Sequence, residues 1–177
     1  MIAFSDINEL NRIIRTQLIK QSELDGSFVR NALSLYGTNL HKETSTNIFQ
    51  TLEQDDVLML FELQIPQNQY DTSMTEDDDS ISYFKSFVMK IIIYGANADN
   101  VAIKTAARLR SEFVLNKLSE EGIYIQTVTD PMSMNEYLND VMWHRADFDI
   151  NFSCMFEIEQ VDNFDNLEQI DITSINE

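Results

Sequence analysis

The sequence predicts an α+β domain whose largely antiparallel or mixed sheet of about four strands is covered by an N-terminal helix and a long central helix. Three observations predict this class. Residues 145–160 alternate apolar and polar side chains, which is the period of a half-buried strand. Residues 57–65 and 83–94 have strand character and are expected to form a long β-hairpin. Residues 6–22 and 97–119 carry apolar side chains three or four positions apart, as amphipathic helices do.

The strand over residues 145–160 is the predicted floor of the sheet. Because side chains at i and i+2 of a strand share a face, it buries one apolar face and exposes a polar, mostly acidic one. The inward residues are Ala146, Phe148, Ile150, Phe152, Cys154, Phe156 and Ile158. Cys154, the only cysteine, is then a small apolar core residue and fits a reducing compartment.

The N-terminal helix is predicted from its capping residues. Asp6 is a favourable N-cap, and Glu9 three positions later completes a capping-box pattern. The pair Asp25-Gly26 is expected to end the helix. Residues 27–54 show no sustained period and are expected to form a mostly extended loop with one short strand.

An acidic loop over residues 67–81 is expected to join the two hairpin strands. The run from Glu76 to Asp79 repels itself and lacks the spacing of an EF-hand, so no calcium site is expected there. At the far end of the second strand, Tyr94-Gly95 is expected to turn the chain.

A single helix is predicted after that turn. Asn97 or Asp99 caps it, and it runs to about Ser119 with Phe113 in its apolar stripe. Gly122 is placed as its C-cap.

The remaining elements complete one predicted domain over residues 1–160. Residues 123–128 form a short strand, and residues 134–142 are expected to form a short helix before the long strand. Residues 161–177 are expected to form an acidic C-terminal arm that is ordered only if a partner receives it.

The net charge of −18 is concentrated in two stretches. Residues 53–79 contain nine acidic residues, residues 146–177 contain nine more, and neither stretch has a Lys or Arg. A basic footprint for nucleic acid is therefore absent. No stretch approaches the ~20 apolar residues of a membrane span, and the N-terminus lacks a signal-peptide pattern, so a cytoplasmic chain without membrane contact is expected.

The most suggestive group of side chains for chemistry is His144, Asp147 and Asp149. Carboxylates at i and i+2 with a histidine could hold a divalent metal. The alternative is a solvated or interface strand face on which Arg145 pairs with Asp147, and it is favoured because His144 points to the other face. Trp143 fits an interface anchor or a rim-of-core aromatic equally well. With no nucleophile–base set and no phosphate-binding glycine loop, we expect no enzyme, no cofactor and no metal.

A motif in the second half of the chain carries a family resemblance. A strand ends at Tyr94-Gly95, an alanine-rich helix and the Gly122 turn follow, and a second strand then begins at Trp143. The strand motif residues are Trp143, Arg145, Ala146, Phe148 and Asp149. In these features the region from about Tyr83 to Phe156 resembles the phage neck or tail terminator family.

The resemblance implies a structural virion protein that is assembled in the host cytoplasm. Its relatives are small α+β domains that form a ring, typically a hexamer, which caps the tail tube or joins it to the neck below the portal. The implied partners are other copies of the chain and tail-tube, neck or portal proteins, with DNA passing through the channel without specific binding. The candidate interface or structural residues are Tyr94, Gly95, Gly122, Trp143, Arg145, Phe148 and Asp149.

Two alternatives remain beside this expectation. One is a head–tail adaptor on a related fold. The other is an acidic DNA-mimic inhibitor, supported by the charge of −18, which tight and salt-sensitive binding to a DNA-binding enzyme would reveal.

Overall fold

The computed structural model describes residues 3–32, 52, 56–65, 74–77, 80–138 and 140–159 of the chain. The elements in chain order are α1 (Ile7–Ser22), a 3-10 turn (Gly26–Phe28), β1 (Val29–Asn31), β2 (Leu58–Gln64), β3 (Met74–Asp77), β4 (Ser80–Tyr94), α4 (Ala98–Leu109), α5 (Glu112–Glu120), β5 (Ile123–Val128), β6 (Met132–Leu138) and β7 (Val141–Glu159). The predicted α+β class is confirmed, but the sheet within the described residues has seven strands rather than about four.

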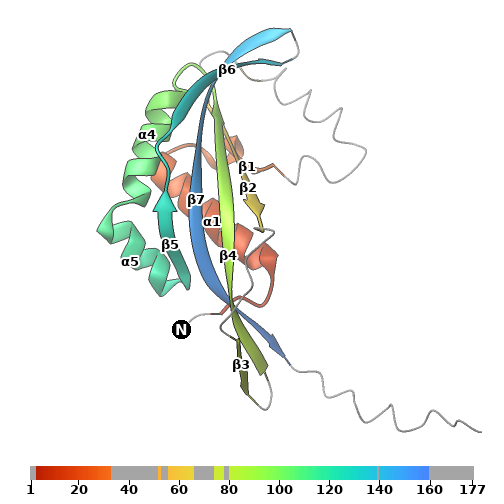
Figure 1. Cartoon of the computed structure of the whole chain (residues 1–177). Coiled ribbons are helices and arrows are strands. Elements are labelled where there is room, and N and C mark those ends of the chain that lie inside the picture. The colour runs from red at the N-terminus through yellow and green to blue at the C-terminus, as the bar shows by residue number, and fades with distance from the viewer. Residues whose placement is uncertain are drawn as a thin grey trace, which may run out of the picture.

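The two longest strands, β4 and β7, form the centre of the sheet and run antiparallel along their whole common length (Figure 1). The strand order is β1-β2-β4-β7-β5, and every pair is antiparallel except β1 with β2. The predicted hairpin partners 57–65 and 83–94 do pair, as β2 and β4. Strand β7 pairs with β4 along one edge, and with β5 and β6, one after the other, along its other edge. Strand β7 therefore organises the sheet, as its alternation predicts.

Helices cover one face of the sheet, as predicted. The buried core joins α1, α4 and α5 to the inward side chains of the central strands, including Ile91 and Ile93 of β4. On β7 the predicted inward residues from Ala146 to Phe156 are all buried. Ile158 lies outside the side chains that the structure describes. Ring contacts within this layer include Phe87 with Phe152, whose centroids lie 5.5 Å apart.

A second, smaller core lies on the opposite face, near the end of the sheet where β6 joins. Its buried members are Ala32, Leu58, Leu60, Tyr94 and Trp143. The strand β2 thus buries both faces: Met59 and Phe61 face the helices, while Leu58 and Leu60 face this second core. The alternation of apolar residues over 57–65 predicts only the buried face that carries Met59 and Phe61.

The predicted central helix is two helices, which is a correction. It breaks at Arg110, and Ser111 caps α5 by accepting a hydrogen bond from the Val114 amide. The Ser111 hydroxyl also donates to Arg108 O at 2.6 Å, which satisfies a carbonyl at the end of α4. The break changes the buried face, so Val114 is buried while Phe113, predicted inward, is 77% exposed.

The predicted short helix over residues 134–142 is wrong. Residues Met132–Leu138 are strand β6, which pairs antiparallel with the start of β7. Leu138 pairs with Val141, so the chain reverses within two residues, and Asp140 adopts a left-handed φ of 62°. Such a conformation is typical of tight hairpin turns and ends any helix.

Three smaller outcomes concern the chain ends and loops. Helix α1 begins as predicted, with the Asp6 carboxylate accepting from the amides of Asn8 and Glu9, and it ends at Ser22 as predicted, before the turn at Asp25-Gly26. The one short strand predicted within 27–54 is β1, and the rest of that stretch lies mostly outside the described residues. The predicted 67–81 loop contains the strand β3, paired with β4. The C-terminal arm lies outside the described residues.

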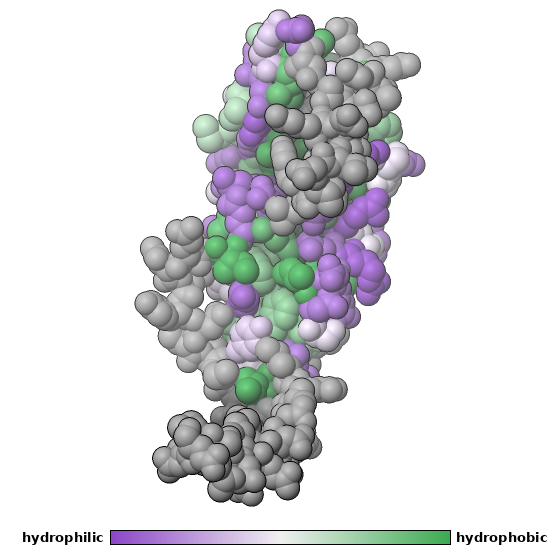
Figure 2. Space-filling model, turned by 90° about the vertical axis from the view of Figure 1, so that its right-hand side faces the viewer, coloured by the Kyte–Doolittle hydropathy of each residue, from purple (hydrophilic) through white to green (hydrophobic). Residues whose placement is uncertain are grey.

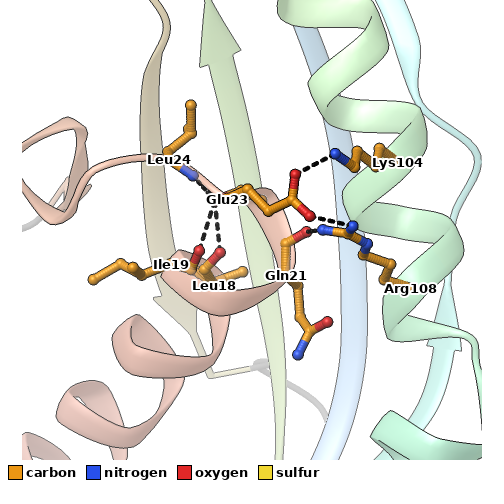
Figure 3. Close-up of polar contacts among 8 residues, drawn as sticks. Leu18, Ile19, Gln21, Glu23, Leu24, Lys104 and Arg108 are labelled. Atoms are coloured by element: carbon orange, nitrogen blue, oxygen red, sulfur yellow. Dashed lines mark hydrogen bonds and ion pairs between the residues drawn. The ribbon is translucent and has the colours of Figure 1, made fainter.

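The end of α1 is tied to α4 by ion pairs (Figure 3). Glu23 has a left-handed φ of 60°, and its carboxylate contacts both Lys104 and Arg108. Arg108 also donates to Gln21 O at 2.8 Å. Hydrogen bonds from Lys104 and Arg108 lower the pKa of Glu23.

Among the described helices, none is long and apolar enough to cross a membrane.

One buried hydroxyl in α4 is expected to reduce stability. Thr105 is fully buried, and its Oγ1 has no hydrogen-bond partner among the described residues. Thr105→Val keeps the shape and removes the unsatisfied polar atom, so we expect a gain of about 1 kcal/mol in the free energy of unfolding. Urea unfolding measures it, and Ser22→Ala is the control, since that hydroxyl donates to Leu18 O at 2.7 Å. A loss of stability in Thr105→Val would contradict the prediction.

Candidate assembly surface

The hairpin of β6 and the first seven residues of β7, hereafter the β6–β7 hairpin, carries most of the candidate residues. Arg145 lies at its base on the face opposite the helices and holds three acceptor oxygens. Its Nε and Nη2 donate to the two carboxylate oxygens of Asp147 at 2.7 and 2.5 Å, and Nη1 donates to Glu136 Oε2 at 2.7 Å. The predicted Arg145–Asp147 pairing is confirmed. A bidentate guanidinium–carboxylate pair of this kind fixes geometry as well as charge.

Tyr94 completes this group of side chains. Its hydroxyl donates to Glu136 Oε2 at 2.6 Å, and its ring lies under the guanidinium, with Cζ of Arg145 5.7 Å from the ring centroid. Tyr94 also belongs to the second core beside Trp143. The outer face of the hairpin is therefore joined to β4 in two ways: by the polar contacts of Tyr94 with Glu136 and Arg145, and by its apolar contact with Trp143. Tyr94, Trp143 and Arg145 all belong to the sequence motif.

The pKa values of this group follow its contacts. Hydrogen bonds to Asp147 raise the pKa of Arg145, so its charge is permanent. Burial raises the pKa of Tyr94, and the hydrogen bond to Glu136 raises it further. Burial acts to raise the pKa of Glu136 as well, but hydrogen bonds from Tyr94 and Arg145 outweigh it, and the pKa is lowered overall.

We expect Glu136 to make the protein less stable in acid. Because its folded-state pKa lies below the ordinary glutamate value of 4.5, its contribution is present above that pH and is lost as the pH falls through the folded pKa. Urea unfolding between pH 3 and 6 should show a shallower pH dependence in Glu136→Gln than in the wild type. The control is Glu120→Gln, an exposed side chain on α5 with no ion pair among the described residues. An identical pH dependence in all three proteins would contradict the prediction.

The inner face of the hairpin is joined to the start of α4. His144 Nε2 lies 2.8 Å from Asp99 Oδ2, and His144 Nδ1 lies 3.1 Å from Asn135 Oδ1. The Ser133 hydroxyl donates to the other oxygen of Asp99. These hydrogen bonds from Ser133 and His144 lower the pKa of Asp99. The hairpin is thus held on both faces before any partner binds.

The alternative of a metal site is not supported by this arrangement. His144 faces Asp99 on the helix side, while Asp147 faces Arg145 on the other side. The structure does not bring His144, Asp147 and Asp149 together. In the part of the chain that the structure describes, no group of three His, Cys, Asp or Glu could hold a metal ion.

The remaining candidate residues have structural positions. Gly95 has φ 125° and donates its amide to His144 O at 3.0 Å, so it forms the junction of β4 with the hairpin. Gly122 follows α5 with φ 79°, the conformation predicted for a glycine after a helix end. Phe148 is buried against the helices. Asp149 is half-buried, opposite Lys90 of β4, on the outer face.

Exposed apolar side chains gather on the β6–β7 hairpin, which sequence analysis does not predict. Of the nine large hydrophobic residues exposed in the described part of the chain, five lie here. They are Met132, Met134, Tyr137, Val141 and Met142. The sequence signal for this surface is weak. Between residues 132 and 142 methionines stand next to polar residues, a pattern that is compatible with a strand as well as with a helix. Concentrated exposed apolar surface of this kind marks protein contact sites.

A groove lies beside these residues on the outer face of the sheet. Its volume is about 450 Å³, and its walls come from β2, β4, β6 and β7. Met132 and Met134 give it an apolar wall, while Glu62, Lys90 and Asp149 give it charged side chains. Figure 2, which turns the right-hand side of Figure 1 toward the viewer, shows hydrophobic surface interleaved with hydrophilic groups along that flank.

These features define a protein of the contact-forming, structural class rather than one built around a catalytic cleft. The chain belongs to the phage neck terminator protein family, whose sequence model matches residues 50–177. The protein is therefore a non-enzymatic structural component of the virion, located at the neck and tail. The resemblance of residues 83–156 is confirmed by this match. Comparison with curated proteins gives no match.

Proposed function

We propose that the protein closes into a ring, a hexamer, that terminates the tail tube or joins the tail to the neck and portal, with a channel through which DNA passes. Its partners are copies of itself and the neighbouring tail-tube, neck or portal proteins. Membership of the neck terminator family supports contacts with tail and neck proteins, and the ring and its channel go beyond that family assignment.

The observation that carries this proposal is the concentration of exposed apolar side chains on the β6–β7 hairpin. The hairpin extends past the helices at the upper end of the molecule (Figure 1). Tyr137 is 63% and Met142 62% exposed there, although the adjoining Trp143 is buried. A projecting surface that meets a different surface of the next copy gives a heterologous contact, and such a contact forms a ring when the rotation closes.

The charge of the chain is consistent with a channel for DNA. The net charge is −18, and the two stretches that account for it hold no basic residue. We propose that these acidic stretches face the channel, where they repel phosphate, so that DNA moves without being bound. A ring with both stretches on its outside would contradict this part of the proposal.

The first experiment is the mass of the purified chain by light scattering over a range of concentration and salt, with negative-stain images. We expect a single assembled species of about six copies with a central opening. Open filaments, or dimers with two-fold symmetry only, would contradict a closed ring. Binding to a basic DNA-binding enzyme that weakens steeply with salt, without ring formation, would instead favour the DNA-mimic alternative.

A further inference from the structure

The five exposed apolar residues of the β6–β7 hairpin fall into two groups that differ in position. Met132 and Met134 lie at its base and line the outer-face groove. Tyr137, Val141 and Met142 lie near the turn at Asp140, at the tip. One end of the hairpin is thus part of a hollow, and the other is a protrusion.

The tip is apolar on both of its faces. Residues that pair across an antiparallel ladder share a face, so Tyr137 and Met142 point to the helix side and Val141 with Leu138 to the outer side. Tyr137, Val141 and Met142 are all exposed. A partner that covered only one face of the hairpin tip would leave the apolar side chains of its other face in water. The tip therefore suits insertion into a hollow, where both faces are covered.

The hairpin is held in place before it meets a partner. Arg145 and Tyr94 bind Glu136 on the outer face, and Asp99 of α4 binds Ser133 and His144 on the inner face. An insert that is already ordered loses little conformational entropy when it binds.

The groove on the outer face has the size and lining that such a tip requires. Its volume of about 450 Å³ is within the range of pockets that bury whole side chains. Its wall includes Met132 and Met134, and the half-buried Ile92 also lines it. The exposed side chain of Lys90 lies at the groove opposite Glu62 of β2 and Asp149 of β7, so the charged groups of the groove are of both signs. Apolar side chains combined with charged and polar groups are the usual composition of a protein contact.

We propose that the tip of the β6–β7 hairpin, led by Tyr137 and Met142, inserts into the outer-face groove of a second copy of this chain. The protrusion and the hollow are separate surfaces of one molecule, so the contact is heterologous and passes from copy to copy. The inference rests on the proposed ring and names the surfaces that form it.

Engineered cysteines in the full chain test the contact directly. Tyr137→Cys and Met132→Cys are combined in one chain, whose own Cys154 is buried. The two positions are five residues apart on opposite faces of β6, about 16 Å, so they cannot form a disulfide within one chain. Under mild oxidation we expect a ladder of linked oligomers, while a mixture of the two single variants should stop at linked dimers. The control pair is Phe113→Cys with Met132→Cys, because Phe113 is more exposed than Tyr137 but lies on α5.

A second pair of variants tests the energetics. Tyr137→Asp and Met142→Asp each place a charge in the apolar contact without touching the buried core, so the Tm of the unassembled chain, measured below the assembly concentration, should stay unchanged. We expect the concentration at half-assembly to rise at least about tenfold in each. Phe113→Asp should assemble as the wild type does.

The outcomes separate this inference from the ring itself. A ladder from the control pair equal to that from the Tyr137–Met132 pair would overturn the inference. So would wild-type rings that neither cross-link through these positions nor weaken in Tyr137→Asp, and in that case the ring would stand. A wild-type chain that stays monomeric at every concentration, with no ladder, would overturn both.

Discussion

Trp143→Ala is expected to lower the free energy of unfolding by about 3–5 kcal/mol, which corresponds to a fall in Tm of about 6–20 °C. Trp143 is 7% exposed and is the largest side chain of the second core, where it packs with Leu58, Leu60 and Tyr94. Removing the indole leaves a cavity between β2 and the base of the β6–β7 hairpin. Urea unfolding and thermal melting measure the loss.

The same variant should also affect assembly if the hairpin is the contact surface. Loss of the second core frees the base of the hairpin, although the ion pairs of Arg145 remain. Phe113→Ala is the matched control, because that aromatic side chain is 77% exposed and its removal should change stability by less than about 0.5 kcal/mol. A loss below about 1 kcal/mol in Trp143→Ala would show that the second core contributes little and that the hairpin is held by its polar contacts.

Side-chain periodicity predicts the centre of this fold well. The alternation on β7 identifies the buried residues from Ala146 to Phe156 because one face of the strand is covered by helices along that whole length. The cap at Asp6 predicts the start of α1 for a similar reason, since the hydrogen bonds to the Asn8 and Glu9 amides are local. Features decided by neighbours in sequence, or by one uniform environment, are therefore predictable.

The errors occur where a single residue changes the direction of the chain. Ser111 accepts a bond from the next turn and starts a new helix, and this local bond outweighs a helical stripe that continues to Phe113. At Asp140 a tight turn produces a strand from residues such as Met134 and Leu138, which are also good helix formers. In both places the apolar spacing fits two structures, and the turn chemistry decides between them.

The candidate site is predictable only in part. Arg145 and Asp147 share a strand face two residues apart, so their pairing follows from the sequence. Tyr94 and Glu136 reach the same group because β4 and β6 both pair with β7, and strand register is a long-range property. The exposed methionines of the hairpin could not be identified without knowing that nothing else in the described chain covers them.

Gly95→Ala is expected to destabilise the protein by at least about 3 kcal/mol, although it adds a single methyl group. Gly95 has φ 125°, a backbone angle that residues other than glycine rarely adopt. A Cβ placed there would lie 2.1 Å from the carbonyl oxygen of Asp56. That oxygen belongs to the backbone, so a rotamer change cannot relieve the overlap. Either the turn after β4 or the segment before β2 must move.

Movement of that turn should also disturb the hairpin, because the Gly95 amide donates to His144 O at 3.0 Å. Gly26→Ala is the matched control: the Cβ there would meet the flexible end of Ile19 at 3.3 Å, so a change below about 1 kcal/mol is expected. Urea unfolding compares the two variants, and hydrogen exchange over residues 132–147 reports on the hairpin. We expect faster exchange there in Gly95→Ala and unchanged exchange in Gly26→Ala. Equal stability of the two variants would show that the chain does not pass this close to Asp56, and the hairpin would then depend on Asp99 and Arg145 alone for its position.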